Sequence, residues 1–212
     1  MARIALIGDS HSQIHFNQIR PELEEAGHEV VFRSSKAGWG VKKFLSTGEL
    51  NDLTSNEPEM AVVALGGNNF KLEDAYGDQM QEFINYLRET GIDRIVWLGP
   101  FESNAETRGD VQDRHQWTAD FQAKYLPRDK NIFWIDMRPP SLGGPWRDGV
   151  HFSRDKYQEM TDAVMERILR YIKRPMILLR PHRTPWFWGG LVVISLGVSY
   201  LIYSAFRSDD VY

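Results

Sequence analysis

The sequence predicts an α/β protein with one parallel sheet covered by helices on both faces. Short apolar runs rich in Val, Ile, Leu and Ala recur along residues 1–136, and longer amphipathic segments separate them. Strands that are apolar throughout are buried on both faces, which is the arrangement that helical crossovers produce in parallel sheets. A length of 212 residues, with 42% hydrophobic and 25% charged residues, suits a single domain with one sizeable core.

Five strands are predicted, and each ends near Gly, Ser or Asp: residues 3–8, 29–33, 60–66, 94–99 and 131–136. Runs of about four to eight apolar residues that stop at such turn formers indicate strands. Helices are predicted over residues 72–90, 105–126 and 154–173. In the last helix, apolar residues recur at spacings of three and four, at Tyr157, Met160, Val164, Ile168 and Tyr171. This face is expected to pack on the sheet.

The segment after the last helix predicts a membrane anchor. Residues 186–206 contain no charged side chain, and Trp186 and Tyr203 lie near opposite ends of this run. A helix of this length, at about 1.5 Å per residue, spans the roughly 30 Å hydrocarbon core of a bilayer. We therefore expect a globular domain over residues 1–174, a linker over 175–185, a transmembrane helix over 186–206 and a tail over 207–212.

Charges beside the span predict its orientation. The basic residues that precede it are Arg170, Lys173, Arg174, Arg180 and Arg183, and no acidic residue lies among them. Only Arg207 follows, beside two aspartates. The more basic side stays inside, and the first residues do not resemble a signal peptide. The globular domain is expected in the cytosol, or on the internal side of a virion or organelle membrane.

Composition excludes several classes of function. The 25 Lys and Arg residues are outnumbered by 29 Asp and Glu, so a broad nucleic-acid-binding surface is not expected. The absence of cysteine excludes disulfides, thiolate metal sites and cysteine nucleophiles. No cluster of metal-ligating residues and no glycine-rich phosphate loop is found, so neither a metal nor a cofactor is predicted. Four histidines are expected to be solvated: His15, His28, His115 and His182.

Three motifs contain the residues with catalytic potential. Ser10 ends a Gly-Asp-Ser sequence after the first strand, at a strand-to-helix turn where backbone N–H groups favour an oxyanion. Asn68 follows two glycines after the third strand, and its amide is a donor. Asp148 precedes His151 by three residues, so a carboxylate can orient a histidine base. Taken singly, each motif also fits an ordinary turn or surface loop.

In order and spacing, these motifs resemble those of the SGNH, or GDSL-type, hydrolases, and the resemblance covers residues 1–173. It implies a flavodoxin-like three-layer sandwich with a five-stranded parallel sheet. It also implies that Ser10 is the nucleophile, His151 the general base and Asp148 the partner that orients the base. The oxyanion donors implied by the resemblance are the backbone N–H groups of Ser10 and Gly38 and the side chain of Asn68.

The chain departs from the commonest family pattern at three places. His11 replaces a leucine, as in members with a Gly-Asp-Ser-His sequence that act on sugar acyl groups. Asn69 replaces an aspartate, while the preceding Asn68 keeps the donor amide. The family also has a glycine after the second strand, which falls here in Lys36-Ala37-Gly38-Trp39-Gly40. Gly40 is an alternative to Gly38, which is preferred because it lies three residues beyond Ser35, where the strand closes.

These observations predict a membrane-anchored serine esterase or deacylase that works through an acyl-enzyme. O-acyl groups on carbohydrate are the favoured substrates, and acyl transfer is a variant. Trp39, Phe101 and Trp146 are expected to rim the pocket and bind substrate, with packing over the strand ends as the alternative. The rival hypothesis is a non-catalytic SGNH-like subunit of a membrane complex or virion. Small residues in the span would then allow a membrane protein partner or an oligomer.

Overall fold

The computed structural model describes residues 1–68 and 75–174. The predicted linker, transmembrane helix and tail lie outside these described residues. Within them, no helix has both the length and the hydropathy needed to cross a bilayer.

A five-stranded parallel sheet forms the centre of the described domain. Its strands are β1 Arg3–Gly8, β2 Glu29–Ser35, β3 Met60–Ala64, β4 Arg94–Leu98 and β5 Ile132–Ile135. They pair in the order β2-β1-β3-β4-β5, and every pair is parallel. The predicted sheet is confirmed. β3 ends at Ala64 rather than at residue 66, because the chain leaves the sheet there to form the turn that carries Asn68.

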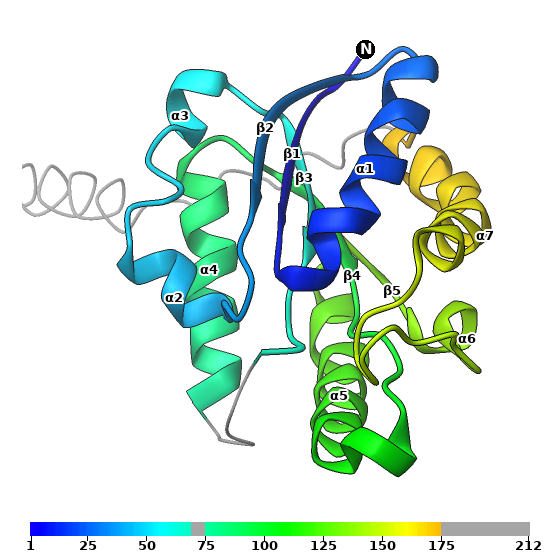
Figure 1. Cartoon of the computed structure of the whole chain (residues 1–212). Coiled ribbons are helices and arrows are strands. Elements are labelled where there is room, and N and C mark those ends of the chain that lie inside the picture. The colour runs from blue at the N-terminus through cyan, green and yellow to red at the C-terminus, as the bar shows by residue number, and fades with distance from the viewer. Residues whose placement is uncertain (69–74, 175–212) are drawn as a thin grey trace, which may run out of the picture. The chain divides into compact units, whose positions relative to one another are not determined.

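Helices cover both faces of this sheet (Figure 1). One face carries α1 Ser10–Glu25 and α7 Arg154–Ile172, and the other carries α2 Val41–Ser46 and α4 Ala75–Glu89. The second layer is extended by α5 Ala105–Tyr125. The remaining short helices of the described residues are α3 Leu53–Asn56, η1 Leu126–Arg128 and α6 Arg138–Ser141.

Alternation along β1 shows why a wholly apolar strand is needed at the centre. Ile4 and Leu6 belong to the core under α1 and α7, while Ala5 and Ile7 belong to the core on the opposite face. Successive side chains of a strand point to opposite faces, so both faces require apolar residues. The apolar face predicted for the last helix is confirmed, because all five of its residues are buried in the first core.

Candidate active site

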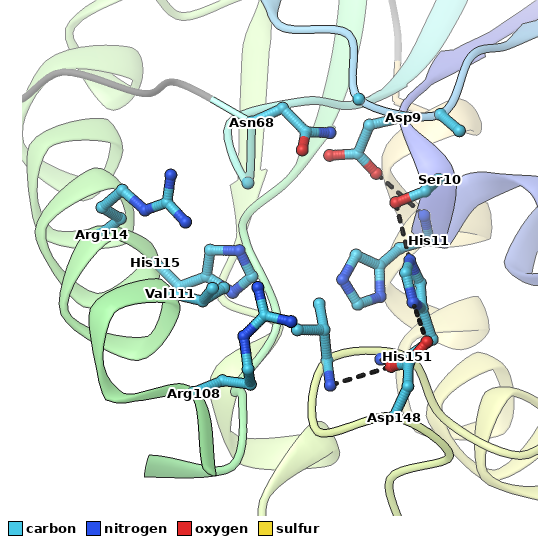
Figure 2. A pocket seen from close by; sticks show the side chains of 14 residues that line it. Asp9, Ser10, His11, Asn68, Arg108, Val111, Arg114, His115, Asp148 and His151 are labelled. Carbon is cyan, nitrogen blue, oxygen red and sulfur yellow. Dashed lines mark hydrogen bonds and ion pairs between the residues drawn. The ribbon is translucent and has the colours of Figure 1, made fainter.

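A pocket of about 330 Å³ opens at the carboxyl edge of the sheet. Its lining comes from the turns after β1, β2 and β3, from the first half of α5 and from the loop before α7. Figure 2 shows Ser10 and His151 on one wall, and three side chains of α5 on the other, namely Arg108, Arg114 and His115. The crevice outside the carboxyl ends of parallel strands is the usual ligand-binding place in such folds.

Ser10 is the first residue of α1, and the turn before it requires glycine at position 8. A Cβ atom on Gly8 would collide with the Ser12 side chain and approach the Ala64 carbonyl oxygen to 2.9 Å. Asp9 caps α1, because its carboxylate accepts a hydrogen bond of 3.1 Å from the His11 backbone N–H. These contacts hold Ser10 at the start of the helix, directly beyond the sheet edge.

Ser10, His151 and Asp148 form one hydrogen-bonded row (Figure 2). Ser10 Oγ lies 2.9 Å from His151 Nε2, and His151 Nδ1 lies 2.8 Å from Asp148 Oδ2. The carboxylate accepts the hydrogen of Nδ1, which leaves Nε2 to accept the hydroxyl hydrogen of Ser10. The structure thus brings the three residues of two separate motifs into contact.

The environment of Asp148 keeps it ionised. Burial alone would raise its pKa, but hydrogen bonds to the carboxylate outweigh this effect. The backbone N–H groups of His151 and Val150 donate to Oδ1 at 2.7 and 3.1 Å, and the His151 ring donates to Oδ2. Together they hold the pKa of Asp148 well below its usual range. A charged carboxylate at this place stabilises a His151 cation.

The loop that carries Asp148 and His151 is docked on the start of α5. The Asn104 N–H donates to the Gly149 carbonyl at 2.8 Å. Gly149 has a φ of +80°, and a Cβ atom there would lie 2.6 Å from Thr107 Oγ1 and 2.9 Å from Arg108 Cγ. Glycine alone combines this backbone conformation with so close an approach.

Gly38 and Asn68, which the family resemblance implies as oxyanion donors, both line the pocket. Gly38 has a φ of +73° and lies in a turn closed by a hydrogen bond of 3.3 Å from the Trp39 N–H to the Lys36 carbonyl. Gly40 is not part of the lining and precedes the first residue of α2. Position therefore favours Gly38 over Gly40. Asn69 lies outside the described residues.

The three aromatic side chains expected to bind substrate do not line the pocket, which corrects that expectation. Phe101 is 3% exposed and belongs to the core, with its ring centroid 4.8 Å from that of His11. Trp39 packs edge-on against Phe44 in the core on the opposite face. Trp146 packs near Phe152 at a centroid distance of 6.1 Å. Packing of these rings against the two cores stabilises the fold.

Two histidines that were expected to be solvated are buried. His15 is 0% and His115 is 2% exposed, and the His115 Nδ1 atom lies 2.8 Å from the Phe101 carbonyl oxygen. Burial lowers the pKa of His15 to about 3 and that of His115 to about 4, so both rings are neutral at pH 7. Among residues 1–68 and 75–174, no three potential metal ligands come together. His182 lies outside this part of the chain.

His11 and Asp9, the neighbours of Ser10 in the chain, also line the pocket. The His11 ring centroid lies 4.9 Å from that of His151, and its Nδ1 atom lies 2.9 Å from the Tyr157 hydroxyl oxygen. Burial lowers the pKa of His11 well below its ordinary value, so this ring adds no charge beside His151. Burial also raises the pKa of Asp9 to about 7, although backbone N–H donors such as that of His11 oppose the shift.

The α5 wall of the pocket was not predicted from the sequence. Arg108 and Arg114 lie in a charged stretch that is typical of a solvated helix face. The helix is broken at Arg108, where φ is −142° and ψ is 45°, and both arginines line the pocket. Gly109, directly after the break, was the only local signal for it, because glycine inside a helical pattern weakens the helix.

Comparison with known proteins adds evidence on the fold. No protein-family model and no curated protein matches the chain. Among solved structures, a lipase/acylhydrolase from Enterococcus faecalis is 17% identical, with a TM-score of 0.65, over 83% of this chain and 99% of its own. A carbohydrate esterase family 3 protein from Talaromyces cellulolyticus is 12% identical, with a TM-score of 0.67, over 83% of this chain and 100% of its own.

Two further structures agree. A GDSL-like lipase from Bacteroides thetaiotaomicron is 15% identical over 81% of this chain and 89% of its own, with a TM-score of 0.61. An acetylxylan esterase from Geobacillus stearothermophilus is 15% identical over 82% of this chain and 95% of its own, with a TM-score of 0.64. At these identities the likeness establishes a shared fold, in agreement with the α/β architecture that the motifs implied.

Proposed function

We propose that this protein is a serine ester hydrolase. The observation that carries the proposal is the row from Ser10 Oγ through the His151 ring to Asp148, with distances of 2.9 and 2.8 Å, beside a pocket at the sheet edge. A hydroxyl is a weak nucleophile until a base accepts its proton, and this row supplies both the base and the group that orients the base.

The reaction begins when Ser10 Oγ attacks the ester carbonyl carbon and its proton passes to His151 Nε2. Asp148 stabilises the resulting imidazolium. The carbonyl oxygen becomes an oxyanion, and it accepts hydrogen bonds from the N–H groups of Ser10 and Gly38 and from the Asn68 amide. The alcohol leaves with the proton held by His151, and an acyl-enzyme remains.

The second half releases the acid. His151, again neutral, accepts a proton from a water molecule, whose oxygen attacks the acyl carbon. Ser10 then leaves as an alkoxide that takes the proton back from His151. Transfer of the acyl group to a sugar hydroxyl follows the same steps with that hydroxyl in place of water.

Labelling of the full chain with a fluorophosphonate probe tests this proposal, because such probes phosphonylate an activated serine. The wild type and a Ser55→Ala control should be labelled to the same extent, because Ser55 is an exposed residue of α3 that bonds to the Asp52 carbonyl. The Ser10→Ala variant should not be labelled. A folded wild-type protein that takes no label would instead favour the non-catalytic subunit.

For substrates, we favour small O-acyl groups on carbohydrate. The support is the Gly-Asp-Ser-His sequence and a pocket of about 330 Å³, and the similar folds include an acetylxylan esterase and a carbohydrate esterase. Among 4-nitrophenyl acetate, butyrate and octanoate, the acetate should give the highest kcat/KM. A preference for octanoate would indicate a lipid ester.

We also propose that residues 186–206 anchor the domain to a membrane, with the domain on the cytosolic or internal side. The support is the charge-free run and the excess of basic residues before it. Protease added outside sealed cells should remove an epitope placed after Tyr212 and leave residues 1–174 intact. Digestion of the domain from outside would overturn the orientation.

A further inference from the structure

We propose that the pocket selects esters that carry an anionic group, and that Arg108, beside Arg114 on the same wall, binds this group. The inference rests on the proposed esterase function and specifies its substrate. Both arginines line the same pocket as Ser10 and His151. Figure 2 shows their guanidinium groups on the α5 wall, across the pocket from the row of Ser10, His151 and Asp148.

Arg108 is held at this wall by the same contacts that place His151. The break in α5 falls at Arg108, whose N–H still donates to the Asn104 carbonyl at 2.8 Å. The N–H of Asn104 in turn donates to the Gly149 carbonyl, and Arg108 Cγ lies 2.9 Å from where a Cβ atom on Gly149 would be. The backbone and stem of Arg108 therefore pack against the loop that carries the triad residues.

The acidic side chains of the lining are occupied by other partners. Asp148 accepts from His151 and from backbone N–H groups, and Asp9 is 4% exposed and caps α1. His11 and His115 are buried and neutral, so they do not alter the charge balance. Among the described lining residues that α5 contributes, the positively charged side chains are therefore the two arginines.

An acidic neighbour of Arg108 is on the solvent side. Asp110 lies 4.0 Å from Arg108, and the two side chains are 75% and 47% exposed. An ion pair this exposed contributes little, so a ligand anion can replace it at small cost. A guanidinium presents planar pairs of N–H donors that match a carboxylate or a phosphate, which makes these two groups the expected ligands. An O-acylated sugar acid or a phosphorylated alcohol has this chemistry.

Four aryl acetates with the same acetyl group test the inference on the full chain. They are 3-acetoxybenzamide, 3-acetoxybenzoate, 3-acetoxyphenyl phosphate and 3-acetoxyphenyltrimethylammonium, with each kcat/KM divided by the rate of hydroxide-catalysed hydrolysis to remove leaving-group differences. At least one anion should exceed the neutral amide by about tenfold, which corresponds to about 1.4 kcal/mol. Preference for the benzoate indicates a carboxylate ligand, and preference for the phosphate ester indicates a phosphate.

The variants identify the cation responsible. The ratio of anionic to neutral kcat/KM should fall about tenfold in Arg108→Gln and be largely kept in Arg108→Lys, which preserves the charge. Arg170→Gln, on the exposed end of α7, is the matched control and should leave the ratio unchanged. A ratio near one in the wild type, or one that survives Arg108→Gln, overturns the inference.

Binding separates this inference from the proposed catalysis. Calorimetry with 3-acetamidobenzoate, 3-acetamidophenyl phosphate and 3-acetamidobenzamide, which are amides and resist hydrolysis, should show at least one anion binding about tenfold more tightly than the neutral compound to the wild type but not to Arg108→Gln. Failure of both anions to bind more tightly overturns the inference and leaves the esterase to the labelling test. Selective anion binding by a protein that hydrolyses none of the acetates supports the anion site and refutes the esterase.

Discussion

At the scale of single residues, Asp148 decides which nitrogen of His151 faces Ser10. Its carboxylate has only acceptor atoms, and the His151 Nδ1–H points at one of them from 2.8 Å. The other oxygen is held by the His151 and Val150 N–H groups. The ring is therefore fixed in the tautomer whose Nε2 accepts a proton.

Asp148→Asn should lower kcat by about 10³- to 10⁴-fold, because an amide that donates to Nδ1 turns the ring to the wrong tautomer. Circular dichroism should show an unchanged fold. Asp162→Asn, on the exposed face of α7, is the control and should keep full activity. A loss of less than tenfold in Asp148→Asn would show that Asp148 does not orient the base.

Asn68→Ala should lower kcat by about 10²- to 10³-fold with little change in KM, because an oxyanion donor acts on charge that develops in the transition state. Steady-state kinetics with 4-nitrophenyl acetate measures both constants. Asn85→Ala, an exposed asparagine of α4, is the comparison. A rise in KM alone would assign Asn68 to ground-state substrate binding.

At the scale of elements, the triad depends on a loop that is held by its own hydrogen bonds and also by its contacts with α5. Gly149 joins the two, through its backbone conformation and its contact with Thr107 and Arg108. Gly149→Ala should therefore displace His151 and lower kcat/KM at least tenfold. Gly91→Ala is the matched control: Gly91 also has a positive φ, of +94°, but a Cβ atom there would meet no described atom within 4 Å.

Alanine is strained by the positive φ at either position, so a difference in kcat/KM between the two variants reports the contact of residue 149 with α5. Unfolding by urea should show a similar loss of stability from this strain in each. Equal kcat/KM in the two variants would mean that the docking on α5 does not position the base.

The local sequence pattern predicted the strands and turns, because burial selects apolar residues and turns select Gly, Ser, Asp and Asn. The central strands β1 and β3 were recognisable because they are apolar on both faces, and their ends placed Ser10 and Asn68 at one edge. The α5 wall was not recognisable, because the contacts of Arg108 and His115 involve Gly149, Phe101 and Ser103, which are set by the tertiary fold. For the same reason Phe101 was expected at the rim although it lies in the core.

At the scale of the whole domain, three histidines are buried beside the active site: His11, His15 and His115. His11 and His15 both pack against Phe101 and Tyr157, and His11 lies 6.1 Å from His115 between ring centroids. Within the described part of the chain, neither ring nitrogen of His15 has a hydrogen-bond partner. Such surroundings accommodate neutral imidazoles and strongly disfavour their cations.

This arrangement predicts loss of stability in mild acid. The folded-state pKa values of His15 and His115, about 3 and about 4, lie below the unfolded value of 6.5, and that of His11 is also lowered. Below pH 6.5 the unfolded chain therefore binds protons that the folded protein does not, and each such group removes up to about 1.4 kcal/mol per pH unit. Asp9 has the opposite sign, because its raised pKa of about 7 favours the folded state as the pH falls.

The three histidines outweigh Asp9, so the free energy of unfolding should fall as the pH is lowered from 6.5 to 4.5. This window lies above the range in which most carboxylates titrate. Urea unfolding at several pH values measures this slope. His15→Leu removes one buried titrating group and should make the slope shallower by up to about 1.4 kcal/mol per pH unit, whereas Asp9→Asn removes the opposing group and should make it steeper. A free energy of unfolding that stays constant or rises toward pH 4.5 would mean that these histidines are not held neutral in the core.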